Sequence, residues 1–234
     1  MTPIPLAIVG LGRMGRAVEQ LAPERGFAVV ARIGKGEVIS RRALNDARVA
    51  IEFTEPSAAP ANIRACVEAG CAVVVGTTGW YAELPTLREE VQRRNGSLLA
   101  APNFSLGVAV FSHLVAEAAR RFAKLPAFDA HLVEIHHAAK RDAPSGTAAA
   151  LAQIAGGARG APVPITSVRT GSVPGTHEML FDAPFEQVRL VHEARDRRVF
   201  AEGALAAARW IVGRHGIFTM EDVIAASDPS IPEQ

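Results

Sequence analysis

The sequence predicts an α/β protein that joins a doubly wound parallel sheet to a second, α+β domain with a mostly antiparallel sheet. Between residues 4 and 105, short apolar strand-like segments alternate with helix-like segments, which is the pattern of a parallel sheet covered on both faces. After residue 129, several strand-like segments follow one another, which favours antiparallel pairing. Turn residues separate these later segments: Gly171, Gly175 and Pro184.

We expect residues 1–105 to form the first domain and residues 106–199 the second. Residues 200–234 are expected to return to the first domain, because a parallel sheet needs helices on both faces. The chain has 234 residues and is 49% hydrophobic, so it can bury a sizeable core.

Charge and composition favour a small-molecule ligand over nucleic acid or a membrane. The chain has 25 Lys+Arg against 24 Asp+Glu, a net charge of +1, and its basic residues are scattered. It enters an apolar segment by Ile4 with no basic leader, and no apolar run approaches the ~20 residues of a membrane span. A cytoplasmic location is therefore expected. Cys66 and Cys71 match no zinc or redox spacing and are expected to be reduced core residues.

A glycine-rich loop follows the first expected strand, residues 4–9, and precedes a helix that Pro23 ends. Its residues are Gly10, Leu11, Gly12, Arg13, Met14 and Gly15. In this context the glycines suit a tight turn, close approach of a pyrophosphate and close helix–strand packing, so we expect a Rossmann-like dinucleotide site. The alternative is a plain glycine-rich turn between a strand and a helix.

Four further strands are expected in the first domain, at residues 27–31, 49–54, 71–75 and 97–101, with helices at 56–69 and around 84–91. Polar or glycine-rich residues follow three of these strands: Thr54, the 76–79 turn, and Asn103 with Phe104. Ligands of such sheets bind beyond the carboxyl ends of the strands, so these ends are expected to converge at the cofactor.

The end of the second strand indicates the type of nucleotide. No acidic residue precedes Glu37 there to bind a ribose 2′-hydroxyl, whereas Arg32 and Lys35 suit a 2′-phosphate. We therefore expect use of NADPH, or of both NADPH and NADH. Alternatively, both side chains are solvated loop charges.

The second domain is expected to begin with a helix from Val108 to Phe122. A strand at residues 129–137 should place Leu132, Glu134 and His136 on one face and the alternate residues on the other. Further elements are expected as follows: strands at 165–170, 177–181 and 186–192, a helix at 200–212, a turn at 216–218, a short helix capped by Thr219, and a loose tail at 228–234.

Residues 134–147 combine proton carriers with an expected helix start. If a helix begins at Ser145, the amides of Gly146, Thr147 and Ala148 point out of its end toward an anion. Two histidines precede this turn at His136 and His137, but adjacent strand residues face opposite ways unless the strand ends between them. No third ligand at a familiar spacing accompanies the pair, so no metal site is expected.

Across nearly its whole length the sequence resembles the dihydrodipicolinate reductase family. The resemblance rests on these segments, in order: 10–15, 51–54, 76–79, 102–105, 134–147, 169–177, 200–204 and 216–218. It implies reduction of 4-hydroxy-tetrahydrodipicolinate to tetrahydrodipicolinate by NAD(P)H, in the synthesis of diaminopimelate and lysine. It also implies a homotetramer formed through the sheet of the second domain.

The resemblance implies a role for individual residues. His136 is similar to the family's proton donor, Lys140 to a second donor and substrate anchor, and His137 to a substrate ligand. The carboxylate-binding turn corresponds to Ser145, Gly146 and Thr147. Besides the glycine loop, Arg32 and Lys35, the expected cofactor contacts are Phe53, Thr54, Gly76, Thr77, Thr78, Ala101, Pro102, Asn103 and Phe104. The chain departs from the family in a glycine loop one residue shorter and an abbreviated stretch between the second and third strands.

Two other functions fit the same motifs. One is a related nicotinamide-dependent reductase of another small dicarboxylate imine or aldehyde, and the other is a nucleotide-binding regulator without turnover. Structural or solvent roles are expected for His131, and ahead of catalysis for His177. Arg141 and Asp142 suit bracing of the loop as well as substrate contact.

Overall fold

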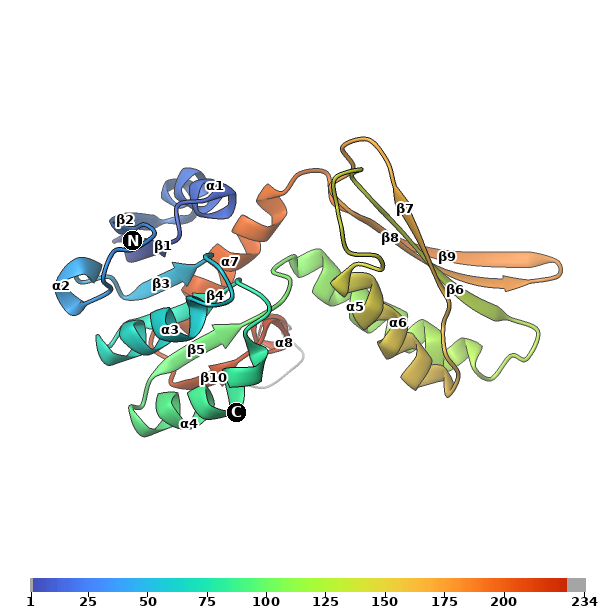
Figure 1. Cartoon of the computed structure of the whole chain (residues 1–234). Helices are drawn as coiled ribbons and strands as arrows, with labels where there is room; N and C mark the ends of the chain where they lie inside the picture. Colours follow the sequence, from blue (N-terminus) through green and yellow to red (C-terminus); the bar gives the residue numbers. More distant parts are fainter. Residues whose placement is uncertain (1, 227–234) are drawn as a thin grey trace. The chain divides into compact units, whose positions relative to one another are not determined.

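The computed structural model describes residues 2–226, which fold into two compact units (Figure 1). Unit 1 comprises the chain up to Leu106 together with the segment from Phe200 onward, and unit 2 comprises Gly107–Val199. The expected tail at 228–234 lies outside the described residues. Within residues 2–226, no helix is long and apolar enough to cross a membrane.

Unit 1 is built on a six-stranded parallel sheet in the order β10-β5-β4-β3-β1-β2. Its strands are β1 (Ile4–Val9), β2 (Phe27–Ile33), β3 (Val49–Glu52), β4 (Ala72–Val75), β5 (Ser97–Ala100) and β10 (Gly216–Phe218). The helices are α1 (Arg13–Leu21), α2 (Arg41–Leu44), α3 (Ala59–Glu68), α4 (Leu84–Arg93), α7 (Arg198–Ile211) and α8 (Met220–Ala225). Two 3₁₀ turns, η1 (Pro23–Arg25) and η2 (Tyr81–Glu83), complete it.

Each face of this sheet has its own apolar core, because side chains alternate along each strand. From β1, Leu6 and Ile8 join a cluster with α1, α7 and α8, whereas Ala7 and Val9 join a cluster with α2, α3 and α4. The expected doubly wound parallel sheet is thus confirmed. Cys66 and Cys71 are free thiols in the second cluster, and burial raises the pKa of Cys71 to about 12.

One expected turn of unit 1 is wrong. Residues 216–218 form β10, which pairs in parallel with β5 at the sheet edge. The segment has three residues and opens on Gly216 at φ +136°, so it resembles a turn until a partner strand supplies its hydrogen bonds. Several boundaries also move: β2 continues to Ile33, β3 ends at Glu52 instead of residue 54, and α7 spans Arg198–Ile211 instead of 200–212.

Unit 2 contains a four-stranded sheet in the order β7-β6-β8-β9, with one face covered by two helices. Its elements are α5 (Leu106–Phe122), β6 (Asp129–His136), α6 (Gly146–Arg159), β7 (Ile165–Arg169), β8 (Thr176–Ala183) and β9 (Glu186–Glu193). The pairs β6–β8 and β8–β9 are antiparallel, and β6–β7 is parallel because α6 is the crossover between them. The mostly antiparallel sheet is therefore confirmed, with one parallel pair.

The burial of β6 alternates as expected. Leu132, Glu134 and His136 point to the buried face, and the strand ends at His136 instead of residue 137. The buried face thereby carries a carboxylate and an imidazole at its last two positions. Such groups are stable in a core only when hydrogen-bonded, so their partners define the site.

Candidate functional site

The glycines of the unit 1 loop differ in whether a side chain would fit at their position. A Cβ atom on Gly10, which has φ +96°, would lie 2.1 Å from the carbonyl oxygen of Phe53, and one on Gly15 would lie 1.9 Å from the oxygen of Gly10. A Cβ on Gly12 would meet no atom within 4 Å. Gly10 and Gly15 therefore serve packing, whereas Gly12 leaves open space at the amino end of α1. A phosphate fits such a position, because the first amides of a helix carry partial positive charge.

The carboxyl ends of neighbouring strands converge beside this loop. The hydroxyl of Thr77, after β4, accepts a hydrogen bond from the amide of Thr54, after β3, at 2.7 Å. The ring of Phe53 occupies the space that a Cβ on Gly76 would need, and it packs edge-on against Phe104 with ring centroids 6.0 Å apart. Pairing of β3, β4 and β5 brings these segments together.

The converging residues differ in what they can offer a cofactor. The side chains of Thr77, Ala101 and Phe104 are buried, so their contact with a ligand would run through the backbone. Those of Thr54 and Thr78 are exposed. Asn103 turns its side-chain oxygen inward to accept the amide of Ser105 at 2.8 Å, which fixes the loop after β5.

Arg32 and Lys35 lie at the end of β2, next to the glycine loop, and each has an ion-pair partner. Arg32 contacts Glu19 of α1 at 2.5 Å, and Lys35 contacts Glu55 at 3.4 Å. The Glu37 carboxylate folds back to accept the amide of Gly34. Both cations are well exposed, so these surface pairs are weak enough to exchange for a phosphate.

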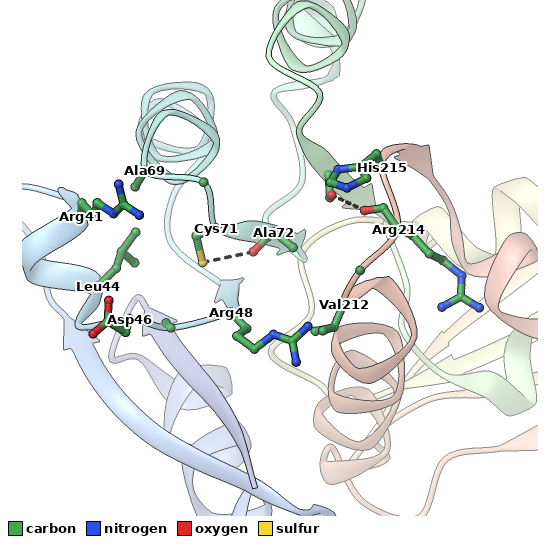
Figure 2. Close-up of a pocket in the computed structure, with 14 residues that line it drawn as sticks. Arg41, Leu44, Asp46, Arg48, Ala69, Cys71, Ala72, Val212, Arg214 and His215 are labelled. Atoms are coloured by element: carbon green, nitrogen blue, oxygen red, sulfur yellow. Dashed lines mark hydrogen bonds between the residues drawn. The ribbon is translucent and has the colours of Figure 1, made fainter. Parts of the chain in front are cut away.

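A pocket of about 290 Å³ lies at the opposite, amino-terminal edge of the same sheet (Figure 2). Cys71 and Ala72 line it beside Arg48, whose guanidinium points toward Val212 at the end of α7. The carboxyl ends of α2, α3 and α7 also meet this pocket, and arginines complement the partial negative charge of such ends. This pocket is therefore distinct from the edge that carries the glycine loop.

In unit 2, the buried end of β6 pairs a histidine with an ionised carboxylate. The Nδ1 atom of His136 is hydrogen-bonded to Oε2 of Glu134, a residue with no exposed surface. Its other oxygen, Oε1, accepts Nη2 of Arg169 at 2.6 Å and the amide of Ser145 at 3.3 Å. Both carboxylate oxygens are thus satisfied. Burial alone would raise the pKa of Glu134, but hydrogen bonds from Arg169, Ser167 and His136 outweigh it and lower that pKa to about 2.

His136 is neutral by default. Burial lowers its pKa, the Glu134 carboxylate raises it, and the Lys140 and Arg169 cations lower it again. Its ring lies edge-on to His177, with centroids 5.3 Å apart. A Cβ placed on Gly175 would come within 3.0 Å of Nε2, so this glycine keeps that nitrogen uncovered.

His177 contacts Ser145, the N-cap residue of α6. Its Nε2 atom lies 3.3 Å from the hydroxyl of Ser145, and that hydroxyl accepts the amide of Ala148 at 3.2 Å. Burial, together with the charges of His136 and His192, lowers the pKa of His177 to about 4, so the ring is neutral at physiological pH.

The amino end of α6 is accordingly only partly open. Ser145 is the N-cap and uses the amide of Ala148, which corrects the expectation that this amide points to a ligand. A Cβ on Gly146 would meet nothing within 4 Å, so the first turn is unobstructed there. The helix is 14 residues long, enough for a full end-charge.

Lys140 and His137 lie on the loop between β6 and α6. The Lys140 ammonium contacts the Asp142 carboxylate at 2.9 Å, and hydrogen bonding to Lys140 lowers the pKa of Asp142. His137 turns to Arg197, with Nε2 2.8 Å from the guanidinium. The end of β6 at His136 therefore lets the two histidines take different partners.

Sequence reasoning assigned no role to Glu134, Arg169, Gly175 or Arg197, and it placed a structural role for His177 ahead of catalysis. Glu134 had a signal, because it precedes His136 by two residues on the same strand face. Arg169 and Gly175 reach His136 through the pairing of β6 with β7 and β8, which needs the strand order. Among residues 2–226, no group of three or more His, Cys, Asp or Glu side chains could hold a metal ion.

Comparison with known proteins identifies the family. Two family models match, dihydrodipicolinate reductase N-terminus over residues 4–104 and dihydrodipicolinate reductase C-terminus over residues 107–224. This chain belongs to the dihydrodipicolinate reductase family. As a member, it is an NAD(P)H-dependent oxidoreductase.

A relative of the same family has a closely similar length. The 4-hydroxy-tetrahydrodipicolinate reductase of Christiangramia forsetii is 36% identical over 94% of this chain and 97% of its own. Among solved structures, dipicolinate-bound dihydrodipicolinate reductase from Paenisporosarcina sp. TG-14 matches with a TM-score of 0.77 at 21% identity, covering 94% of this chain and 99% of that one. GenD2 from gentamicin A biosynthesis, in complex with NAD, matches with a TM-score of 0.58 at 12% identity, covering 96% and 91%. At these identities the two structures show the fold alone.

Proposed function

We propose that this chain reduces 4-hydroxy-tetrahydrodipicolinate to tetrahydrodipicolinate with NADPH or NADH, in the synthesis of diaminopimelate and lysine. The observation that carries the proposal is the end of β6, where a carboxylate-paired histidine and a lysine precede a helix start that is open at Gly146. The match of both halves of the chain to the reductase family supports it.

The substrate of this reaction is a dianion, and unit 2 has the groups to bind it. One carboxylate at the Ser145–Gly146–Thr147 turn would meet the end-charge of α6, a stabilisation of about 0.3–2 kcal/mol. Lys140 would exchange its surface contact with Asp142 for a second carboxylate. The Arg197 guanidinium, which donates to Nε2 of His137, extends this cationic region.

When bound at the glycine loop, the nicotinamide cofactor supplies the hydride. Loss of the 4-hydroxyl group requires an acid at the departing oxygen, and the reduced product needs a proton. We assign proton delivery to His136 through Nε2, because Nδ1 is held by Glu134, and assign Lys140 as the second donor. The dianion would raise the pKa of His136 and so charge the ring when substrate is present.

NADPH is the preferred nucleotide in this proposal. Arg32 and Lys35 flank the glycine loop, and Glu37 is engaged with the amide of Gly34, so no described carboxylate among these residues is left to bind a 2′-hydroxyl. The cations would exchange Glu19 and Glu55 for the 2′-phosphate.

We further propose a cytoplasmic homotetramer formed through the open face of the unit 2 sheet. Register aligns Val133 of β6 with Glu178 of β8 and Val191 of β9, and it pairs Ile135 with Val168. Val168 and Val191 are 36% and 54% exposed, although they belong to strands of a sheet whose other face is fully packed. Exposed valines on this face favour its burial against another copy.

The experiment that tests the function is a turnover assay with the substrate generated in situ and NADPH oxidation followed by absorbance. His136→Ala and Lys140→Ala should each lower kcat at least ~10²-fold and leave nucleotide affinity nearly unchanged. Lys124→Ala, an exposed lysine of unit 2, is the matched control and should retain full activity.

The same assay separates the alternatives. A reductase of another dicarboxylate imine or aldehyde would bind NADPH but leave 4-hydroxy-tetrahydrodipicolinate unreduced. A regulator without turnover would oxidise no NADPH with any substrate, and both substitutions would then be silent. Unchanged kcat in both variants of an active protein would overturn the site assignment.

A further inference from the structure

Glu134 occupies an unusual position for a buried carboxylate, because its partners His136, Arg169 and Ser145 belong to the candidate site. It has no exposed surface, and its two oxygens face different groups. Oε2 bonds Nδ1 of His136, while Oε1 accepts Arg169 and the amide of Ser145. A carboxylate without these partners would be strongly unfavourable in this core.

We propose that Glu134 is the positioning residue of the reaction: it fixes His136 in the Nδ1–H form and joins it to the carboxylate-binding turn. The inference rests on the proposed function, in which His136 delivers a proton. Glu134 itself would touch neither substrate nor cofactor. It would act through the imidazole on one side and through the Ser145 amide on the other.

The position of the hydrogen on the His136 ring follows from its hydrogen bond to Glu134. The carboxylate accepts at both oxygens, so the nitrogen of His136 that faces it must carry a hydrogen. In the neutral ring Nε2 is then the free lone pair, and in the charged ring Nε2–H is the acid. Gly175 leaves that nitrogen uncovered.

Arg169 holds the Glu134 carboxylate in place. Its Nη2 atom bonds Glu134 and also donates to the carbonyl oxygen of Asp142 at 2.6 Å, so one guanidinium links β7 to the loop that carries Lys140. The Glu134 carboxylate therefore holds the proton donor His136 and the start of α6 directly, and it holds the loop of Lys140 through Arg169. A displacement of Glu134 would misplace all three.

Substitution of Glu134 by glutamine makes a sharp test. Arg169 and the Ser145 amide both donate toward Oε1, so the amide oxygen of glutamine must face them. The NH₂ group of the glutamine then faces Nδ1 of His136. Because an NH₂ group can only donate, Nδ1 must accept, and the neutral ring carries its hydrogen on Nε2. The size of the side chain is almost unchanged.

Loss of the carboxylate also lowers the proton affinity of the ring. The charged and titratable groups that face His136 are Glu134, Lys140, Arg169 and His177. Glu134 is the one that favours the charged ring, while Lys140 and Arg169 oppose it. In Glu134→Gln, the decline of kcat with rising pH should therefore begin at lower pH than in the wild-type protein.

Three measurements on the full chain decide the proposal. Nitrogen-15 NMR of labelled histidines should show His136 as Nδ1–H in the wild-type protein and as Nε2–H in Glu134→Gln. The variant should lose kcat about 10²-fold, in the range of a general acid. Its affinity for dipicolinate, used as an unreactive dianion, should stay within about fivefold of wild type, since Lys140 and the α6 end remain.

Glu117→Gln is the matched control, because Glu117 also pairs with an arginine, Arg121, but does so at the exposed surface of α5. It should leave tautomer and kcat unchanged. An Nε2–H ring in the wild-type protein, or a Glu134→Gln variant with wild-type kcat and pH profile, would overturn the proposal. The NMR readout needs no turnover, so an inactive wild-type protein would defeat the proposed function without deciding this inference. If Glu134→Gln fails to bind dipicolinate, Arg169→Gln, which removes the guanidinium from Glu134, must lower kcat for the proposal to stand.

Discussion

Alanine substitutions at two glycines of the same loop should separate packing from nucleotide binding. In Gly15→Ala the new Cβ would lie 1.9 Å from the oxygen of Gly10, a contact that backbone must move to relieve. Overpacking of this kind destabilises by roughly 1–3 kcal/mol, and a backbone obstacle places it at the upper end. For a chain of this size that corresponds to a fall in Tm of about 6–12 °C.

Gly12→Ala should do the reverse. Its Cβ would meet no atom within 4 Å, and Gly12 has φ −75°, which alanine adopts readily. Its Tm should therefore lie within about 2 °C of wild type. The methyl group would nevertheless occupy the space at the amino end of α1, so NADPH affinity should fall at least about tenfold, or ~1.4 kcal/mol.

Thermal shift without ligand and fluorescence titration with NADPH measure the two effects on the same samples. The reasoning is refuted if Gly12→Ala binds NADPH as tightly as wild type, since the open space would then not receive the pyrophosphate. An unchanged Tm for Gly15→Ala would show that the close packing of α1 on β1 relaxes without cost.

Three further predictions concern the cofactor, the assembly and pH. Replacing both Arg32 and Lys35 by alanine should raise the KM for NADPH about tenfold and leave the KM for NADH unchanged; equal effects on both would remove the 2′-phosphate assignment. Val191→Asp, at a 54% exposed position of β9, should dissociate the proposed tetramer, as measured by light scattering after size exclusion, whereas Val110→Asp on α5 should not. A tetrameric Val191→Asp variant would refute the proposed interface. His177 is buried and neutral, with a pKa of about 4 against an ordinary 6.5, so its contribution to stability is complete above pH 6.5 and is lost as the pH falls toward 4, by up to about 3 kcal/mol. In thermal melts, the His177→Gln variant should accordingly lose less stability between pH 7 and pH 5 than the wild-type protein does. If the stability of both proteins falls equally with pH, His177 is not the cause of the loss.

The local pattern of apolar residues and glycines was sufficient to predict most of the fold. The apolar run of β1 followed by closely spaced glycines predicts a parallel strand and its turn, because both depend on neighbouring residues alone. The alternation along β6 likewise predicts which face Leu132 and Glu134 occupy. β10 escaped prediction because its three residues become a strand only beside β5.

The site divides in the same way. His136, Lys140 and Ser145 lie within ten residues, so the chain itself brings them together. Arg169 and Gly175 come from β7 and the loop before β8, and their proximity to His136 follows from strand order. The use of the Ala148 amide by Ser145 depends on a rotamer, which no sequence pattern specifies.

The interrupted path of unit 1 has a consequence for its biosynthesis. The ribosome releases β1 to β5 first, then all of unit 2, and only afterwards α7, β10 and α8. Until then β5 exposes an unpaired edge, and the face that carries Leu6 and Ile8 lacks its main cover. About a hundred further residues must be synthesised before the sheet can be completed, and until then its open edge and apolar face favour aggregation.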